Sequence, residues 1–182
     1  MVYIFSEKQL PIISSEIQLI EKRIVFEKLL KSVSEADSEI KVFEGLLSPE
    51  LESLALESGT FSRFKTDLRL KAGEFEKLYK LWIQKSGRAG EVLLPDSQAG
   101  FVSCKVKEDL GQIGLIAVDK SQRGKGWGKR LIHAAESFAF FKGAKKMRIG
   151  TQEANQIACS LYQNLGYEVV ERVWVYHFLS NK

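Results

Sequence analysis

The chain has 182 residues, of which 45% are hydrophobic and 27% charged, as is ordinary for a soluble globular protein that buries a core. No apolar run approaches the ~18 residues of a membrane span, and the first residues lack the basic flank and long apolar core of a signal peptide. Two cysteines and two histidines are too few for a disulfide framework or a zinc site. We therefore expect a cytoplasmic protein with no metal and no membrane association.

The positive charge is concentrated in the second half of the chain. Residues 1–100 contain 14 basic and 16 acidic residues, a net of −2, whereas residues 101–182 contain 13 and 7, a net of +6. Five cations lie between positions 120 and 130 with no acid among them. Such a patch could bind nucleic acid, but Phe and Tyr are not interleaved with the cations and no nucleic-acid-binding motif is present. We expect a focused anion site and no nucleic-acid partner.

Apolar periodicity, caps and breakers divide the chain into helices and strands. The clearest helix start is Ser48-Pro49, a cap followed by a proline at the first helical position, and Gly59 ends that helix. The expected elements are, in chain order, a strand within 17–30, a helix over 49–58, a loop over 60–67, a helix over about 72–85, strands over 91–94, 99–107 and 112–118, a glycine-rich loop with a long helix, a strand over 146–151, a helix over 154–165, and strands over 167–170 and 173–179. Short links favour antiparallel pairing of the strands before residue 119. This order predicts an α/β (α+β) protein, a mixed sheet with helices on its faces.

The glycine-rich loop joins the end of a strand to the start of the long helix. A helix N-terminus has unpaired N–H groups and a partial positive charge, and together these bind anions. Alternating glycines let the backbone approach a ligand, and neighbouring cations add charge. These residues are Gly124, Gly126 and Gly128, with Lys125, Lys129 and Arg130. The loop predicts a phosphate or pyrophosphate site, but it lacks the GxxxxGK[ST] of a P-loop and the GxGxxG with a following acid of dinucleotide-binding folds.

The loop matches the pattern RxxGxG at Arg123, Gly126 and Gly128, and in this the chain resembles the GCN5-related N-acetyltransferases (the GNAT family). The resemblance covers about residues 91–182 and implies a mostly antiparallel central sheet with helices on both faces. It also implies acetyl-CoA as cosubstrate, with its pyrophosphate on the loop and its pantetheine arm along the preceding strand. The cofactor-binding residues that it implies are Ile116, Ala117, Val118, Arg123, Gly124, Lys125, Gly126, Trp127, Gly128, Lys129, Asn155 and Tyr162.

A second signature lies in the helix expected over 154–165. Asn155 and Tyr162 are seven residues apart and share a face of this helix, while Ile157, Leu161 and Leu165 take another face that we expect to pack on the sheet. On spacing alone, Tyr162 is either a half-buried packing tyrosine or a proton donor. The resemblance implies that Asn155 contacts the cofactor and that Tyr162 is the general acid for the departing thiolate.

The general base is not evident. Residues 116–118 hold no carboxylate, although many GNAT enzymes place one on this strand, and Asp119 belongs to the turn. A lysine acceptor has a pKa of about 10.4 and needs a base, whereas a sugar amine needs less help. The missing carboxylate therefore favours a less basic acceptor.

A narrower resemblance points to the same acceptor. Segments 54–82 and 150–176 resemble the dTDP-fucosamine acetyltransferases, which acetylate the 4-amino group of a nucleotide-linked deoxysugar. The acceptor-side residues that this implies are Arg63, Phe61, Phe64, Trp174 and Tyr176. For the two phenylalanines the alternative is core packing, and for Arg63 it is a solvated loop charge.

Three functions remain open from the sequence. The first is an acetyl-CoA-dependent N-acetyltransferase for a nucleotide-linked amino sugar. The second keeps the enzyme and changes the acceptor to a protein or peptide amine, a polyamine or an aminoglycoside, and the third is a non-catalytic acyl-CoA-binding module. For the enzyme, residues 1–90 are expected on the acceptor side and residues 91–182 in the acetyl-CoA-binding core of one continuous domain. A homodimer is compatible with the sequence.

Overall fold

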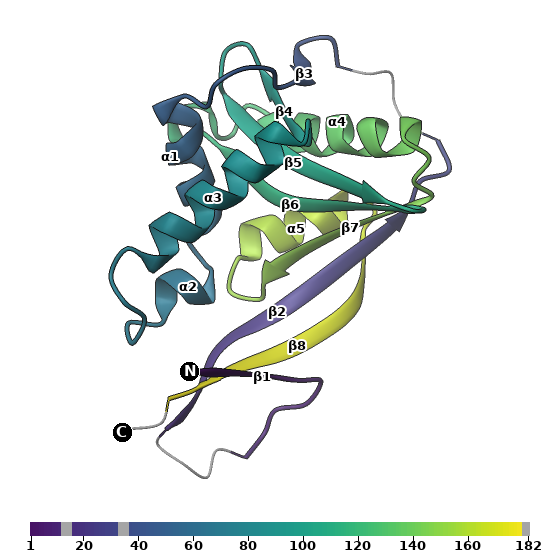
Figure 1. Ribbon diagram of the computed structural model, residues 1–182. Helices are drawn as coiled ribbons and strands as arrows, with labels where there is room; N and C mark the ends of the chain where they lie inside the picture. The colour runs from purple at the N-terminus through teal and green to yellow at the C-terminus, as the bar shows by residue number, and fades with distance from the viewer. Residues whose placement is uncertain (12–15, 33–36, 180–182) are drawn as a thin grey trace.

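The computed structural model describes residues 1–11, 16–32 and 37–179 of the chain. The strands are β1 (Val2–Ser6), β2 (Ile17–Leu29), β3 (Ile40–Val42), β4 (Val92–Pro95), β5 (Gly100–Lys107), β6 (Leu110–Val118), β7 (Lys146–Gln152) and β8 (Glu168–Phe178). The helices are α1 (Pro49–Ser58), α2 (Arg63–Thr66), α3 (Glu74–Arg88), α4 (Trp127–Phe141) and α5 (Gln156–Asn164), with a 3-10 turn, η1 (Lys120–Gln122), before α4. The strands form one eight-stranded sheet in the order β1-β8-β2-β7-β6-β5-β4-β3 (Figure 1).

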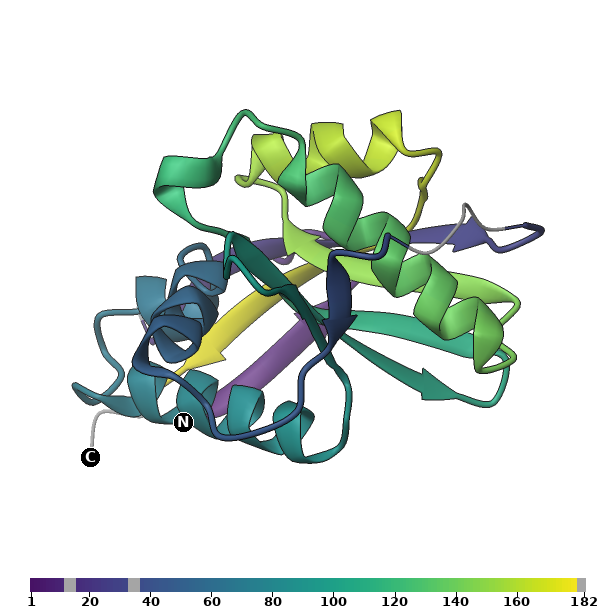
Figure 2. The same cartoon turned by 90° about the horizontal axis from the view of Figure 1, so that it is seen from above.

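Helices cover both faces of this sheet, which confirms the predicted fold class. Helices α4 and α5 lie on one face, and α1, α2 and α3 lie on the other (Figure 2). Strands β6 and β7 pair in parallel, because α4 forms the crossover between them, whereas the other neighbouring strands pair antiparallel. The short links from β4 to β6 form antiparallel pairs, as predicted.

Strand β2 occupies a central place that the sequence did not predict. It lies between β7 and β8 and is antiparallel to both, so that Arg23 pairs with Gln152 on one side and with Val173 on the other. Phe26, near its middle, is 1% exposed. The N-terminal residues are therefore built into the same sheet as the glycine-rich loop.

Helix α3 extends beyond its predicted end. It continues through Ser86 and Gly87 to Arg88, where the sequence predicted a break. Ser86 is buried, and a Cβ built on Gly87 would lie 3.7 Å from Phe43, so tertiary packing supports this last turn. The chain instead turns at Gly90, whose φ is 64°.

Two further regions differ from the expectation. The loop predicted over 60–67 contains the short helix α2, which Ser62 caps by accepting from the Phe64 N–H. The two predicted last strands are one strand, β8, because Arg172 pairs with Ile24 and so continues the ladder.

The buried face of α5 also differs from the predicted one. Ile157 is 86% exposed, whereas Cys159 and Tyr162 are the buried side chains of this helix. Cys159 and Tyr162 are three residues apart and lie on one helix face, and this face meets the aromatic side chain of Phe26 on β2. The expected packing face of Ile157, Leu161 and Leu165 is therefore wrong for Ile157, while Leu161 and Leu165 are partly buried.

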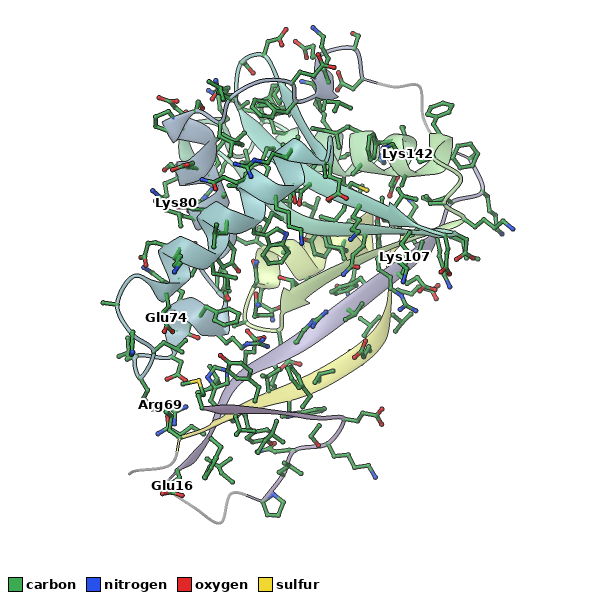
Figure 3. All side chains as sticks on the ribbon, viewed as in Figure 1. Glu16, Arg69, Glu74, Lys80, Lys107 and Lys142 are labelled. Carbon is green, nitrogen blue, oxygen red and sulfur yellow. The ribbon has the colours of Figure 1, made fainter. Side chains whose placement is uncertain are left out.

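A buried charged cluster fastens the chain after α2 to strand β8. The carboxylate of Asp67 accepts from Arg69 Nε at 2.8 Å and lies 2.5 Å from His177 Nδ1. The hydrogen bond from Arg69, and then that from His177, hold the pKa of Asp67 well below its usual range. Figure 3 shows Arg69 beside the ends of β1 and β8, next to the N-terminus.

The described residues contain no helix that is long and apolar enough to cross a membrane. Within the same residues, no group of three or more His, Cys, Asp or Glu side chains is placed to hold a metal ion. Cys104 and Cys159 are buried free thiols.

Candidate active site

Strand β6 contains a β-bulge in its middle. Between Ile113 and Ile116 it has one more residue than its partner β5, as the shift in register shows. The Ser103 hydroxyl accepts a hydrogen bond from the Leu115 N–H at 2.8 Å, which satisfies an amide that the bulge displaces from the ladder. The bulge also reverses the side chains, because Ile113 belongs to the core under α4 and Leu115 to the core under α1 and α3.

Strands β6 and β7 separate at this bulge. Their parallel pairing reaches Ile113 and Ile149, after which β6 continues beside β5 and β7 continues beside β2. The two strands diverge towards the end of the molecule where α2 lies (Figure 1). A Cβ built on Gly114 would lie 3.2 Å from the Trp82 ring, so the indole of α3 bounds this region on one face of the sheet. We call this region, in which β6 and β7 no longer pair, the strand opening.

The backbone of β6 presents alternate residues to the strand opening. The N–H groups of Leu115 and Asp119 donate towards β5 and its preceding residue. Because backbone groups alternate sides along a strand, those of Ile116 and Val118 face the strand opening and that of Ala117 faces β5. The backbone groups of two of the three strand residues that the resemblance implies thus face the strand opening.

The glycine-rich loop begins α4 with an N-terminus that no side chain caps. Gly126 is the N-cap with a φ of 84°, and Gly124 has a φ of 75°. A Cβ built on either glycine would meet nothing within 4 Å, so a ligand can approach the backbone there. Gly128 differs from our expectation, because a Cβ on it would lie 3.1 Å from Leu161 Cδ2. This third glycine allows α4 to pack on α5.

Arg123, the first residue of the loop pattern, is held by the protein. Its guanidinium donates to Glu57 Oε1 at 2.8 Å and to the Val118 carbonyl at 3.3 Å. The hydrogen bond from Arg123, and then the charge of Lys120, lower the pKa of the Glu57 carboxyl. Arg123 therefore ties the loop to α1 and to the end of β6.

The other four cations of residues 120–130 divide into two paired and two available side chains, and Lys120 is paired with Glu57 at 3.5 Å. Arg130 donates to Asp37 at 2.7 Å and lies over the Trp127 ring at 4.0 Å, so its charge, which we expected at the anion site, is largely neutralised. Lys125 hydrogen-bonds the Gln122 amide, and in the described part of the chain neither Lys125 nor Lys129 has an acidic partner. These two lysines supply the free positive charge beside the α4 N-terminus.

Tyr162 lies on the buried face of α5, with 3% of its surface exposed. Its ring meets Phe26 edge-on at 5.5 Å and Tyr167 at 6.3 Å between centroids. Burial, and then the Cys159 thiol, raise the pKa of Tyr162 above its usual range, so the hydroxyl keeps its proton at neutral pH. No hydrogen bond joins that hydroxyl to another described residue. Because the neighbouring Leu161 packs on Gly128, the Tyr162 hydroxyl belongs to the helix that flanks the glycine-rich loop.

Asn155 caps the start of α5 rather than lying within it. Its Oδ1 accepts from the Ala158 N–H at 3.3 Å, and its Nδ2 donates to Thr151 Oγ1 at 3.3 Å. The amide therefore fixes α5 to the end of β7, and a contact with a cofactor would replace or add to these bonds.

Arg63 is packed among aromatic rings. Its guanidinium carbon lies 4.7 Å from the Phe64 centroid, 5.0 Å from that of Tyr3 and 5.4 Å from that of Phe5. The side chain is 17% exposed and faces Glu21, with 3.8 Å between Nη1 and Oε1. Arg63 is thus neither a solvated loop charge nor placed at an open surface for a diphosphate.

The other expected acceptor-side residues do not share one surface. Phe61 is 42% exposed in the turn before α2. Tyr176 is fully buried, and its hydroxyl accepts from the Leu10 N–H at 2.7 Å, so a substrate could touch it only if the N-terminal segment moved. Trp174 is half-buried, with the Lys22 ammonium 6.0 Å from its ring.

A pocket of about 480 Å³ lies where β2 extends past the end of β7. We call it the β2 pocket. It is lined by Leu19, Ile20, Glu21 and Lys22 of β2, by Phe61 and Thr66 around α2, and by Gln152, Glu153, Ala154 and Gln156 at the turn into α5. Among the expected acceptor-side residues, Phe61 lines this pocket. Glu21 and Gln152 were not expected, because no local pattern reveals which strand β2 joins.

The geometry agrees with the comparisons to known proteins. The family model described as "Acetyltransferase (GNAT) family" matches residues 54–167, and the chain belongs to that family. It is 28% identical over 112 residues to the uncharacterized N-acetyltransferase MJ1207 of Methanocaldococcus jannaschii, covering 57% of this chain and 50% of that protein. It is 26% identical over 88 residues to N-alpha-acetyltransferase 30 of Saccharomyces cerevisiae, covering 46% of this chain and 50% of that protein. The chain thus spans about half the length of the curated relatives that it matches.

Solved structures share the fold. The Bacillus subtilis acetyltransferase, solved in complex with CoA, gives a TM-score of 0.55 at 21% identity and covers 78% of this chain and 99% of that chain. A GCN5-related N-acetyltransferase from Sphaerobacter thermophilus gives a TM-score of 0.60 at 17% identity and covers 88% of this chain and 52% of that chain. The narrower likeness to dTDP-fucosamine acetyltransferases finds no support among these matches.

Acetyltransferases of this family use acetyl-CoA, and the residues present fit that molecule. A pyrophosphate suits the N-terminus of α4, which no side chain caps, and the open sides of Gly124 and Gly126. Lys125 and Lys129, which have no acidic partner among the described residues, add positive charge there. The free edge of β6 suits an amide-containing arm, because backbone N–H and C=O groups need partners.

Proposed function

We propose that the chain is an acetyl-CoA-dependent N-acetyltransferase that transfers acetyl directly to the primary amine of an amino sugar. The observation that carries this proposal is the strand opening in the sheet, with the uncapped N-terminus of α4 beside it and the Tyr162 donor on the adjoining helix. A non-catalytic acyl-CoA-binding module would need the strand opening and the α4 N-terminus. It would not need the protonated Tyr162 hydroxyl, which hydrogen-bonds no other described residue.

Several residues would bind acetyl-CoA together. The N–H groups at the start of α4, with Lys125 and Lys129, would bind the pyrophosphate, and the backbone of Ile116 and Val118 would pair with the arm. When bound, acetyl-CoA supplies the activated thioester. A free N–H on this strand edge would stabilise the negative charge that develops on the acetyl oxygen. Tyr162 would give its proton to the departing sulfur, since its hydroxyl is protonated at neutral pH.

The β2 pocket supports an amino sugar as the acceptor. Its volume of about 480 Å³ lies within the usual range for small-molecule sites. The exposed ring of Phe61 offers a flat apolar face, and Gln152 and Gln156 offer amides that both donate and accept bonds to hydroxyls. The cation of this lining, Lys22, is already paired with Glu153 at 3.5 Å. A nucleotide diphosphate attached to the sugar would therefore extend outside the pocket. In this proposal residues 1–90 form the acceptor side, since they supply β2 and Phe61.

A protein N-terminus is the second candidate acceptor. The name of the yeast relative, N-alpha-acetyltransferase 30, favours it. A peptide is longer and more flexible than an amino sugar. Measuring turnover with a panel of both kinds of amine therefore separates the two candidate acceptors.

The test is release of free CoA thiol from acetyl-CoA in the presence of single amines. The panel contains dTDP-4-amino-4,6-dideoxygalactose, glucosamine, galactosamine, spermidine and short peptides with a free N-terminus. The proposal expects amino sugars to have the highest kcat/KM. Turnover of peptides alone would overturn the sugar acceptor, and the absence of turnover with every amine would overturn the enzymatic activity.

A further inference from the structure

Strand β2 carries a bulge at the β2 pocket. Its register against β8 shifts between Leu19 and Glu21, and its pairing with β7 begins only at Arg23. Bulges of this kind redirect a side chain and interrupt pairing beside functional sites. Glu21 thus stands on a stretch of β2 that has no neighbour strand on the β7 side.

Two elements besides β2 itself hold the carboxylate of Glu21 in place. Its Oε2 accepts from the Arg63 backbone N–H at 3.0 Å and from Gln152 Nε2 at 3.2 Å. The Arg63 guanidinium is 3.8 Å from Oε1. The Glu21 side chain is 7% exposed and lines the β2 pocket. A side chain fixed by β2, α2 and β7 at once loses little freedom when it binds a ligand.

One oxygen of this carboxylate is left for a ligand. In the part of the chain that the structure describes, Oε1 accepts no hydrogen bond, and the Arg63 nitrogen nearest to it lies beyond hydrogen-bond range. An ionised carboxylate can accept about four hydrogen bonds through its two oxygens. An oxygen with unused capacity on a largely buried carboxylate in a pocket favours a ligand that donates, and a neutral primary amine donates up to two bonds.

The other carboxylate of the pocket provides a contrast. Glu153 is 43% exposed and is paired with Lys22 at the pocket's edge. Its charge is screened by solvent, so it has less to offer a ligand than the largely buried carboxylate of Glu21.

We propose that Glu21 binds the acceptor amine in the β2 pocket, accepting a hydrogen bond from its nitrogen at Oε1 and orienting it towards the strand opening. The inference rests on the proposed acetyltransferase function and deepens it. It assigns acceptor recognition to a strand that precedes the segment matched by the family model, residues 54–167. It also means that the pocket selects an amine over a hydroxyl at the same position.

The test compares Glu21→Gln with Glu153→Gln. Glutamine keeps the shape of Glu21 and can still accept from the Arg63 N–H, but it loses the charge. The probe is the amine of the panel with the highest kcat/KM for the wild type. For E21Q we expect KM for that amine to rise about tenfold or more, with kcat within about threefold of the wild type. The dissociation constant for CoA should be unchanged, and E153Q should resemble the wild type in every value.

A second readout separates recognition from a purely structural role. The hydroxyl analogue of the probe, with OH in place of NH₂, is used as a competitive inhibitor. E21Q should lose the preference for amine over hydroxyl, whereas a variant that only loosens α2 would weaken both equally. If E21Q does not fold, Glu21→Asp is the second variant. It keeps the charge but moves the carboxylate one methylene away from the bound amine, and its KM for that amine should rise at least threefold.

The outcomes distinguish this inference from the function on which it rests. A wild type that acetylates no amine refutes the proposed function and the inference together. A wild type that turns over amines, with folded E21Q or E21D at unchanged KM, refutes the role of Glu21 alone.

Discussion

The substitution Tyr162→Phe removes one hydroxyl and leaves the buried ring in place. The ring contacts with Phe26 and Tyr167 remain, and the lost hydroxyl bonds no described residue. We therefore expect the free energy of unfolding to change by less than about 1 kcal/mol. By contrast, Tyr162→Ala would leave a cavity in the core and cost about 3–5 kcal/mol.

The kinetic effect of the same substitution should be large. If Tyr162 protonates the departing sulfur, its loss lowers kcat by a factor of about 10²–10⁴, which is about 3–5 kcal/mol of activation free energy. The dissociation constant for CoA should stay within about twofold. Because burial raises the pKa of Tyr162, the wild-type kcat should not lose this donor until the pH exceeds about 10.

The assay measures thiol release at saturating acetyl-CoA, with calorimetry for CoA and a thermal melt on the same samples. Tyr167→Phe is the matched control, since it removes a hydroxyl from a neighbouring buried ring that has no proposed role in catalysis. A folded Y162F with wild-type kcat, or a Y167F with an equal loss, would refute the assignment of the general acid.

Two further predictions concern charge. Lys125→Ala and Lys129→Ala should each weaken CoA binding about threefold to tenfold and reduce the dependence of that binding on salt. Arg130→Ala should leave the dissociation constant for CoA unchanged, because Arg130 is already paired with Asp37. Calorimetry at two salt concentrations checks this, and an R130A effect as large as the lysine effects would contradict it. Asp67→Asn should lower the free energy of unfolding by about 2 kcal/mol at pH 7. The folded-state pKa of Asp67 is depressed, so its stabilisation is present above about pH 4 and is lost as the pH falls below that. Urea unfolding between pH 7 and 2 should therefore show less acid destabilisation in D67N than in the wild type, and an equal slope in both proteins would contradict the prediction.

Local chemistry made the glycine-rich loop and the strand and helix that flank it predictable from the sequence. The glycines with positive φ, the strand before them and the helix after them are neighbours in the chain, so their signals lie within one short window. The role of Gly128 was not predictable in the same way, because it depends on Leu161 of another helix.

Long-range pairing explains what the sequence could not reveal. Nothing in residues 17–29 indicates that β2 enters between β7 and β8, because a strand sequence specifies a buried face but not its partner. The ion pair of Arg130 with Asp37 joins segments that are far apart in the chain. The packing of Arg63 against the rings of Tyr3 and Phe5 does the same. For the same reason the pairing of Glu21 with Gln152 across the β2 pocket became visible only in the folded chain.

Backbone amide shifts recorded while CoA is titrated into the isotope-labelled chain test the central claim most directly. We expect saturable binding with the largest shifts at residues 124–129 and at Ile116 and Val118, and small shifts in β1 and β3. Saturable binding whose largest shifts fall elsewhere, or no binding at millimolar CoA, would contradict the account.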